Sequence, residues 1–418
     1  MFTVFSDCYE WFNQNSLAKE ALSLDILLAW AKELDILPHA PVITITGTNG
    51  KGSAASVLTH LLTYKNYKVA SFTSPHLTSW TERITINNTP VTEQEMIDAF
   101  IFLKNKIPIL KLKFFQILFF IALFLFKKQN LDFIILEVGI GGKHDITNII
   151  DATLVILTQV GLDHTELLGE TREKIGFEKA GLLRPEIFFV CGDDDPPQSV
   201  LQEVNKHACQ SFWQNKDFFY REYLSAWDIN FPFCQFDNLP LPLLNHKNIA
   251  SALMAGMCLD VFPDDYFLKN ILPHISLAGR IEQHIFAERK IILDVAHNPS
   301  AIEHLIFNIK KVISQKQKIF ILFGAMKDKN IVSMLSLLQE IAYQWYFTDL
   351  NLERAASADM IGEIYQNLSN KKNNFSVFQN PHFAWEAILS ESSKNDVILI
   401  CGSFHTVYAI HSLLKLNN

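Results

Sequence analysis

The sequence predicts an α/β fold in two parts: an N-terminal domain with a phosphate loop (P-loop) on a mostly parallel sheet, and a smaller C-terminal α/β domain of Rossmann-like type. Two observations carry this prediction. Short apolar, β-branched runs alternate with helical patterns through the first two-thirds of the chain, and the same alternation resumes near Lys290. A chain of 418 residues also exceeds one typical core. We expect the domains to span residues 1–280 and 289–418, with a linker at 281–288.

The expected elements follow in chain order. In the first domain the strand patterns are Val42–Ile45, Leu131–Val138, Ala152–Thr158 and Ile187–Cys191, and the helical patterns are Ala54–Tyr64, Phe114–Phe126 and Glu173–Leu183. Residues 212–244, which are rich in aromatic residues and prolines, are typical of short strands and turns in a peripheral subdomain or an edge hairpin. In the second domain the strand patterns are Ile291–Val295, Ile319–Phe323, Trp345–Thr348 and Val397–Cys401. Parallel sheets bind ligands at the carboxyl ends of their strands, so motifs just after strands are the functional candidates.

The most informative motif joins the first strand to the first helix, where residues 47–53 read G-T-N-G-K-G-S. Glycines let backbone N–H groups converge on phosphate oxygens, and the helix N-terminus adds a positive dipole. Lys51 suits the β- and γ-phosphates and Ser53 suits Mg²⁺, although Gly52 intervenes where the common pattern has the hydroxyl residue. The alternative is an ordinary Gly-rich turn. The candidate nucleotide-binding residues of this loop are Gly47, Thr48, Asn49, Gly50, Lys51, Gly52 and Ser53.

Three other polar residues of the first domain are candidates. Glu137 ends an apolar strand just before G-I-G-G, where a carboxylate is costly unless it is paired or binds a metal. It is either an Mg²⁺ ligand or an acid bound to the glycine backbone. His164, after Leu162-Asp163, is either a ligand at the same edge or a polar packing residue. Lys179, on pattern alone, is more typical of a solvated lysine late in a helix.

Three candidates belong to the second half of the chain. Asp294 and His297 lie in I-I-L-D-V-A-H-N-P, where a strand ends in a polar turn. They are candidates for nucleotide contact across a domain cleft, or members of an Asx-type turn. Arg280, in L-A-G-R-I-E at the expected hinge, has a guanidinium that suits a phosphate.

Composition excludes several classes of function. A net charge of −8 argues against nonspecific nucleic-acid binding, which needs a basic surface. Phe114–Phe126 is strongly apolar, but a membrane span needs about 20 such residues, so we expect a buried helix and no membrane association. The six cysteines form no C-x-x-C pair, and the first residues lack the features of a signal peptide. Both observations favour reduced thiols in a cytoplasmic protein.

Several short blocks of residues occur in order along nearly the whole chain. They are T-G-T-N-G-K-G-S (46–53), S-P-H-L with T-E-R-I (74–84), L-E-V-G-I-G-G-K-H-D-I-T-N (136–148), L-D-H-T-E-L-L-G (162–169), E-K-A-G (178–181), N-L-P-L-P-L (238–243), G-R-I-E (279–282), L-D-V-A-H-N-P (293–299) and C-G-S-F-H-T-V (401–407). Together they resemble the Mur-ligase superfamily of ATP-dependent amide-forming enzymes. Within it, the chain is similar to the dihydrofolate synthase/folylpolyglutamate synthase family.

The resemblance implies roles for individual residues. The implied magnesium ligands are Ser74, Glu137 and His164, with Ser53 of the loop. The implied catalytic residues are Lys51, which holds the triphosphate with its loop, Lys179, which matches a lysine that becomes carbamylated, and His297. Further nucleotide contacts are implied for Asn248, Arg280 and Asp294. Folate contacts are implied for Phe115, Asp145 and Ile146.

The resemblance also implies a reaction. An ATP- and Mg²⁺-dependent ligase would add L-glutamate to dihydropteroate, forming dihydrofolate, and to the γ-carboxylate of folates, forming folylpolyglutamates, through an acyl phosphate. Two Mg²⁺ ions would be its cofactors, ATP its co-substrate and these small molecules its only partners, and the chain would be a monomer. Three anions must meet in this reaction, which fits two metals, a lysine loop and an arginine.

Three alternatives stay open at this stage. The first is a folylpolyglutamate synthase without the dihydropteroate step, because Lys143-His144, Ile146 and the Lys113–Gln116 segment depart from the family pattern on the pterin side. The second is another Mur-type ligase that joins an amino acid to a peptidoglycan nucleotide precursor, against which the S-P-H-L block and the aromatic loop favour the folate branch. The third is a P-loop ATPase that acts as a switch without ligation.

Overall fold

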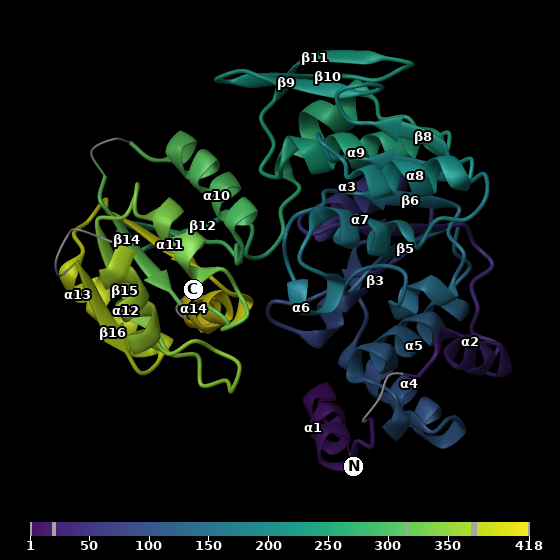
Figure 1. Ribbon diagram of the computed structural model, residues 1–418, viewed down its shortest axis with the longest axis horizontal. Coiled ribbons are helices and arrows are strands. Elements are labelled where there is room, and N and C mark those ends of the chain that lie inside the picture. Colours follow the sequence, from purple (N-terminus) through teal and green to yellow (C-terminus); the bar gives the residue numbers. More distant parts are fainter. Residues whose placement is uncertain (1, 19–21, 315–316, 369–373, 417–418) are drawn as a thin grey trace. The chain divides into compact units, whose positions relative to one another are not determined.

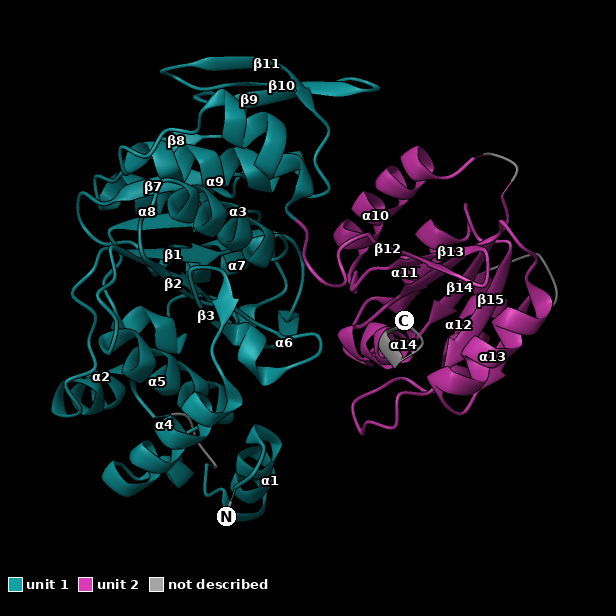
Figure 2. Cartoon of the chain, turned by 180° about the vertical axis from the view of Figure 1, so that it is seen from behind, with its two compact units in different colours: residues 1–275 teal, residues 276–418 magenta. Residues whose placement is uncertain are grey.

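Two compact units make up the chain in the computed structural model, residues 1–275 and residues 276–418 (Figure 2). The structure describes residues 2–18, 22–314, 317–368 and 374–416. The expected linker at 281–288 instead contains strand β12 (Glu282–Phe286), which pairs antiparallel with β13 (Arg289–Leu293). Ala287 and Glu288 between them have φ angles of 46° and 62°, the left-handed conformation of a tight hairpin turn. The boundary between the units therefore falls a few residues earlier than expected.

A mixed sheet forms the centre of the first unit. Its strands are β1 (Val42–Thr46), β2 (Val69–Phe72), β3 (Ile84–Ile86), β4 (Thr89–Pro90), β5 (Phe133–Glu137), β6 (Leu154–Leu157), β7 (Phe188–Cys191) and β8 (Gln210–Trp213). Within the described residues their order is β4-β3-β2-β5-β1-β6-β7-β8. All neighbours from β2 to β8 pair in parallel, and β3 and β4 add an antiparallel edge. Every residue of β1 is buried, as expected for a central parallel strand.

Helices cover both faces of this sheet (Figure 1). Helices α3 (Lys51–Tyr64) and α9 (His246–Cys258) pack together on one face. Helices α5 (Phe114–Lys127), α7 (Arg172–Ala180) and α8 (Gln198–Lys206) lie on the other face. Leu136 packs in the apolar cluster that contains α5, and Val155 packs in the one that contains α7 and α8. Both residues pair with Thr44 of β1, so their side chains point to the same face of the sheet. The remaining α-helices of the unit are α1 (Phe5–Asn15), α2 (Leu24–Glu33), α4 (Glu93–Lys106) and α6 (Thr165–Leu168).

Helix α5 confirms the prediction of a buried apolar helix. Residues 116–123 of this helix are all buried, and Phe119 packs edge-on against Phe72 of β2 with 5.5 Å between the ring centroids. In the part of the chain that the structure describes, no helix is both long enough and apolar enough to cross a bilayer. The hydrophobicity of α5 therefore serves the core of the first unit.

The aromatic region at 212–244 forms a peripheral sheet, as predicted. Strands β9 (Phe219–Glu222), β10 (Ala226–Asn230) and β11 (Gln235–Pro240) pair antiparallel in the order β11-β10-β9, at the top of Figure 1. Trp227 anchors this sheet: its side chain is fully buried, and its indole N–H donates to the carbonyl of Pro240 at 3.0 Å.

The second unit is a smaller α/β layer structure. Its further strands are β14 (Ile319–Phe323), β15 (Gln344–Thr348), β16 (Phe375–Phe378) and β17 (Val397–Cys401). The order is β12-β13-β17-β14-β15-β16 in the described ranges, and all pairs except β12–β13 are parallel. Its helices are α10 (Pro299–Val312), α11 (Ile331–Leu338), α12 (Ala358–Leu368), α13 (Pro381–Glu391) and α14 (Phe404–Leu416). A separate apolar core fills this unit, with Ile321 and Leu399 of the central strands at its centre.

The six cysteines are all free, as the sequence predicts. Burial raises the pKa of Cys8, Cys191 and Cys258 to about 12. Burial also raises the pKa of the other thiols, those of Cys209, Cys234 and Cys401. These thiols are therefore protonated at neutral pH and behave as small apolar groups.

Candidate active site

The predicted phosphate loop connects β1 to α3, with Gly50 as the residue that precedes the helix. Gly47 and Gly50 have φ angles of 146° and 86°, which L side chains rarely adopt. A Cβ on Gly47 would lie 1.9 Å from the hydroxyl oxygen of Thr158, and one on Gly50 would lie 2.2 Å from Oδ1 of Asn248. The loop is therefore closely packed against the end of β6 and against α9, and Asn248 lies directly beside it.

Lys51 and Thr48 fix the shape of this loop. The Lys51 ammonium donates to the carbonyl of Gly47 at 3.0 Å, so the side chain folds back over its own loop. The Thr48 hydroxyl donates to the carbonyl of Gly161 at 3.1 Å and accepts from the Gly161 N–H at 2.8 Å. Ser53 is buried in the first turn of α3. Hydrogen bonds thus join the phosphate loop, at the end of the first strand, to the segment after β6.

Glu137 brings a buried carboxylate to the same edge of the sheet. It is 3% exposed, and its Oε2 accepts a hydrogen bond from the Ser74 N–H at 3.0 Å. A Cβ on Gly52 would lie 3.6 Å from this oxygen, so the carboxylate faces the phosphate loop. Burial lowers the pKa of nearby Arg83 to about 10, against the opposing charges of Glu137 and Glu82. The structure thus places Ser74 and Glu137 together, with a cation beside them.

Lys179 is buried, contrary to the solvated side chain that its pattern favours. It is 3% exposed, near the end of α7. The glycine turn after β5 explains this placement, because a Cβ on Gly142 would lie 2.8 Å from the carbonyl oxygen of Lys179. Burial, together with the charge of Lys51, lowers the pKa of Lys179 to about 7, and the charge of Asp163 opposes both. The amine therefore holds no fixed charge near neutral pH.

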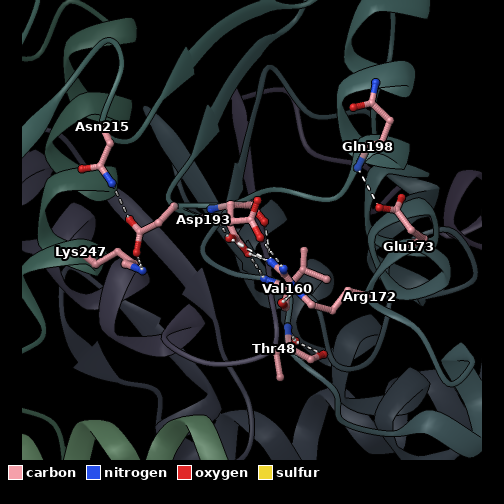
Figure 3. Close-up of polar contacts among 11 residues, drawn as sticks. Thr48, Val160, Arg172, Glu173, Asp193, Gln198, Asn215 and Lys247 are labelled. Atoms are coloured by element: carbon pink, nitrogen blue, oxygen red, sulfur yellow. Dashed lines mark hydrogen bonds and ion pairs between the residues drawn. The ribbon is translucent and has the colours of Figure 1, made fainter.

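An arginine clamp holds the segment between β6 and α6 (Figure 3). The Arg172 Nε–H donates to the carbonyl of Val160 at 2.9 Å, and its guanidinium lies 3.3 Å from Asp193. Asp193 in turn accepts from the Val160 N–H at 2.6 Å. This segment leads to His164, which has a φ of 50° and precedes the short helix α6. The clamp therefore sets where the backbone of His164 lies relative to the phosphate loop.

The three candidates for folate contact surround the turn after β5. A Cβ on Gly139 would lie 2.8 Å from Cζ of Phe115 and 3.2 Å from Oδ2 of Asp145, so both side chains meet there. Asp145 accepts the hydroxyl of Thr147 at 2.7 Å. Burial raises the pKa of Asp145, against hydrogen bonds from Thr147 and the turn. Ile146 is buried in the core of the first unit.

Gln116, in the segment that departs from the family pattern, has a structural role. The side-chain oxygen of Gln116 accepts the N–H of Lys113 at 2.9 Å, which closes the N-terminus of α5. Glutamine and glutamate serve equally in this capping arrangement. Gln116 is therefore compatible with the helix that carries Phe115.

The second unit gathers its own candidates at the carboxyl end of β13. Asp294 is buried and accepts from the Ile281 N–H at 2.9 Å and from the Ala296 N–H at 2.8 Å. Burial raises the pKa of Asp294, against the charge of Arg280. The Arg280 guanidinium lies 5.3 Å from the ring centroid of Phe404, and the His297 ring lies 5.9 Å from it. Arg280, Asp294 and His297 therefore form one cluster around an aromatic ring.

Several residues at these sites escaped prediction. In the first site these residues are Thr158, Arg83 and the Arg172–Asp193 pair, and in the second site the residue is Phe404. The clamp had a signal in the sequence, because the run G-D-D-D at 192–195 directly follows the apolar strand β7. Its arginine partner lies in a helix 21 residues earlier, a pairing that only the fold reveals.

Known proteins share this arrangement. Residues 279–404 match the family model described as Mur ligase, glutamate ligase domain. The Escherichia coli protein named dihydrofolate synthase/folylpolyglutamate synthase is 33% identical over 92% of this chain and 90% of its own length. A solved structure of E. coli FolC in complex with DHPP and ADP superposes with a TM-score of 0.92 at 30% identity, covering 99% of this chain and 98% of that one.

A second solved structure agrees. The bifunctional folylpolyglutamate synthase/dihydrofolate synthase from Yersinia pestis, complexed with AMPPNP and Mn ion, superposes with a TM-score of 0.91 at 31% identity, over 99% of this chain and 98% of that one. A phosphate loop on a parallel sheet, followed by a glutamate ligase domain, defines a Mur-type ligase. Within that class, the chain belongs to the dihydrofolate synthase/folylpolyglutamate synthase family.

Gly50 and Gly52 offer a matched test of the loop geometry. Gly50→Ala is expected to lower the free energy of unfolding by about 1–2 kcal/mol, because Gly50 has a left-handed φ and a Cβ would collide with Asn248. Gly52→Ala is expected to be neutral or to raise it by up to about 1 kcal/mol, because the added Cβ makes only ordinary contact in a helix. Equilibrium urea unfolding compares the two variants, and equal losses would contradict this account of the loop.

The low pKa of Lys179 predicts how stability depends on pH. Between about 7, its folded pKa, and 10.5, its ordinary value, the unfolded chain binds a proton that the folded chain does not. The free energy of unfolding contributed by this group therefore rises with pH across that window, by on the order of a few kcal/mol in all. Lys179→Met should remove this rise. Urea unfolding of both proteins over the same pH series, in bicarbonate-free buffer, measures the difference; identical slopes would contradict a buried neutral amine.

Proposed function

We propose that this chain is an ATP- and Mg²⁺-dependent ligase that adds L-glutamate to dihydropteroate and to the γ-carboxylate of folates. The observation that carries the proposal is the end-to-end family match, which spans both units. The phosphate loop with its facing carboxylate and the glutamate ligase type of second unit support it. The first unit then binds ATP and the folate substrate, and the second completes the ligase.

The first site fits a nucleotide–magnesium complex. Glu137 is a buried carboxylate facing the phosphate loop, and oxygen ligands are those that Mg²⁺ prefers. Glu137, Ser74, Ser53 and His164 would hold the metal, which would supply charge neutralisation at the transferred phosphoryl group. Lys51 and the loop N–H groups would hold the triphosphate, with Asn248 beside Gly50.

The reaction proceeds in two displacements. A carboxylate oxygen of the acceptor attacks the γ-phosphorus of ATP, the bond to the β-phosphate oxygen breaks, and ADP leaves with an acyl phosphate formed. The amine of L-glutamate then attacks the acyl carbon, loses a proton, and expels inorganic phosphate as the amide forms. Lys51 stabilises the charge that develops on the phosphoryl oxygens.

The cluster in the second unit suits nucleotide binding. Arg280 supplies a guanidinium for phosphate, and Asp294 is a buried carboxylate that orients the Arg280 segment by accepting the Ile281 N–H. His297 lies in the same cluster and is the candidate for proton transfer during ligation. Its ring is fixed by a contact of 2.8 Å between Nδ1 and the Val295 carbonyl.

Lys179 is proposed to become carbamylated. A carbamate forms when a neutral amine attacks CO₂ and loses a proton, and the low pKa of Lys179 makes the neutral amine available. The product is an anion, which the positive charge of Lys51 would favour and which would suit a second Mg²⁺. The family resemblance points to the same modification.

The turn after β5 is proposed to bind the folate ring system. Phe115 offers an aromatic face and Asp145 a carboxylate at one point of the chain. Because Ile146 is buried in the core, its bulk is accommodated by packing. Both acceptors are therefore expected to react. We also propose a cytoplasmic location, which six free cysteines support, and a monomeric state, which only the family resemblance suggests.

ADP release tests the proposed reaction directly. Purified chain with ATP, Mg²⁺ and L-glutamate is assayed with dihydropteroate or with tetrahydrofolate as acceptor. Turnover is expected with both, and only when glutamate is present. Lys51→Ala should lower kcat/KM at least about 100-fold by removing phosphoryl charge stabilisation.

Each other outcome of that assay selects an alternative. Turnover with tetrahydrofolate alone would make the chain a folylpolyglutamate synthase. ATP hydrolysis without any folate would instead support an ATPase switch. Dependence on a nucleotide-linked sugar acceptor would indicate a different Mur-type ligase.

Labelled bicarbonate tests the carbamate. Incubation with isotopically labelled bicarbonate should give one carbamate resonance in the carbon NMR spectrum of the protein, and Lys179→Ala should lack it. Short carboxylic acids are expected to restore part of the lost ligase activity of Lys179→Ala, because they replace the missing anion. If the wild-type protein showed full activity but no carbamate resonance after this incubation, the proposed modification would be wrong.

A further inference from the structure

A cluster of two histidines and a glutamate lies in the second unit, apart from the residues assigned to the reaction. Glu282 and His284 sit on the same face of β12, and His411 comes from α14. The His284 Nε2 lies 2.8 Å from Oε1 of Glu282, and the His411 Nε2 lies 3.2 Å from the same oxygen. One ligand atom from each residue lies within 4.8 Å of the others, and in the described part of the chain this is the one group that meets this criterion.

We propose that Glu282, His284 and His411 form a binding site for a divalent transition-metal ion of the Zn²⁺ class. Two imidazole nitrogens and one carboxylate oxygen are a ligand set that such ions bind, with a fourth position left for water. Imidazole ligands favour Zn²⁺, Co²⁺ or Ni²⁺ over Mg²⁺, which prefers oxygen. This site is thus different in kind from the oxygen-rich site at Glu137.

The burial of His411 supports the proposal. Its side chain is 3% exposed, and its Nδ1 is buried without a hydrogen-bond partner among the described residues. The fold holds this ring with its Nε2 directed at Glu282, so the cluster includes one imidazole that needs little ordering to bind an ion.

The framework around the cluster is already fixed. Oε2 of Glu282 accepts the Gly279 N–H at 2.7 Å, which leaves Oε1 directed at the two imidazoles. A strand and a helix carry the three residues, so little ordering is needed on binding. His284 and Glu282 have side-chain exposures of 25% and 22%, which gives an ion a path from solvent.

Cobalt absorption tests the site on the full chain. Co²⁺ is titrated in the presence of excess Mg²⁺, which occupies oxygen-ligand sites and competes poorly for imidazole. We expect a saturable visible absorption band at one equivalent, typical of a site with few ligands. His284→Gln should lose the band, and His382→Ala, at an exposed histidine of the same unit, should retain it.

A second measurement guards against misfolding of the variant. Zn²⁺ should raise the Tm of the wild type and of His382→Ala, and should leave the Tm of His284→Gln unchanged. Absence of the cobalt band in the wild type, or an equal band in His284→Gln, would overturn the proposal. Neither readout involves ATP, folate or glutamate, so the result is independent of the proposed ligase reaction.

Discussion

The candidate active site depends on the register of β1 between its two parallel neighbours. Ile45 pairs with Glu137 of β5 on one side and with Ile156 of β6 on the other. Because parallel strands end at the same edge, this register brings the phosphate loop, the Glu137 carboxylate and Thr158 together. The close contacts at Gly47 and Gly52 follow from the same alignment. A shift of one residue would turn Glu137 to the opposite face of the sheet and separate these groups.

Charge at this edge is balanced between buried groups. Burial and the charge of Lys51 lower the pKa of Lys179, while Asp163 and Glu178 raise it. Glu137 similarly faces the buried guanidinium of Arg83. Such an arrangement is costly to assemble in a low-dielectric interior, and it is typical of sites that must bind several anions at once. The membership of this chain in a family of ATP-dependent ligases accounts for that cost.

The sequence predicted the framework better than the environment of individual side chains. The bounds of β14 and β17 agree with the predicted strands, because continuous apolar runs of that length leave little choice. Lys179 shows the limit: helical periodicity describes one helix, whereas its burial comes from the Gly142 turn on another segment. The Arg172–Asp193 clamp and Phe404 were missed for the same reason, since each depends on contacts between distant parts of the chain. The hairpin at Ala287-Glu288 was not predicted, because its turn contains no glycine or proline, the residues that usually indicate a turn.

The state of the cysteines has a practical consequence for studying how this protein works. Alkylating reagents attack the thiolate, and Cys8, Cys191 and Cys401 are buried with raised thiol pKa values. A single cysteine introduced at an exposed position of either unit would therefore react far faster than these three native cysteines. Fluorescent or spin probes can then be attached without first removing native residues from the cores that hold the site in place.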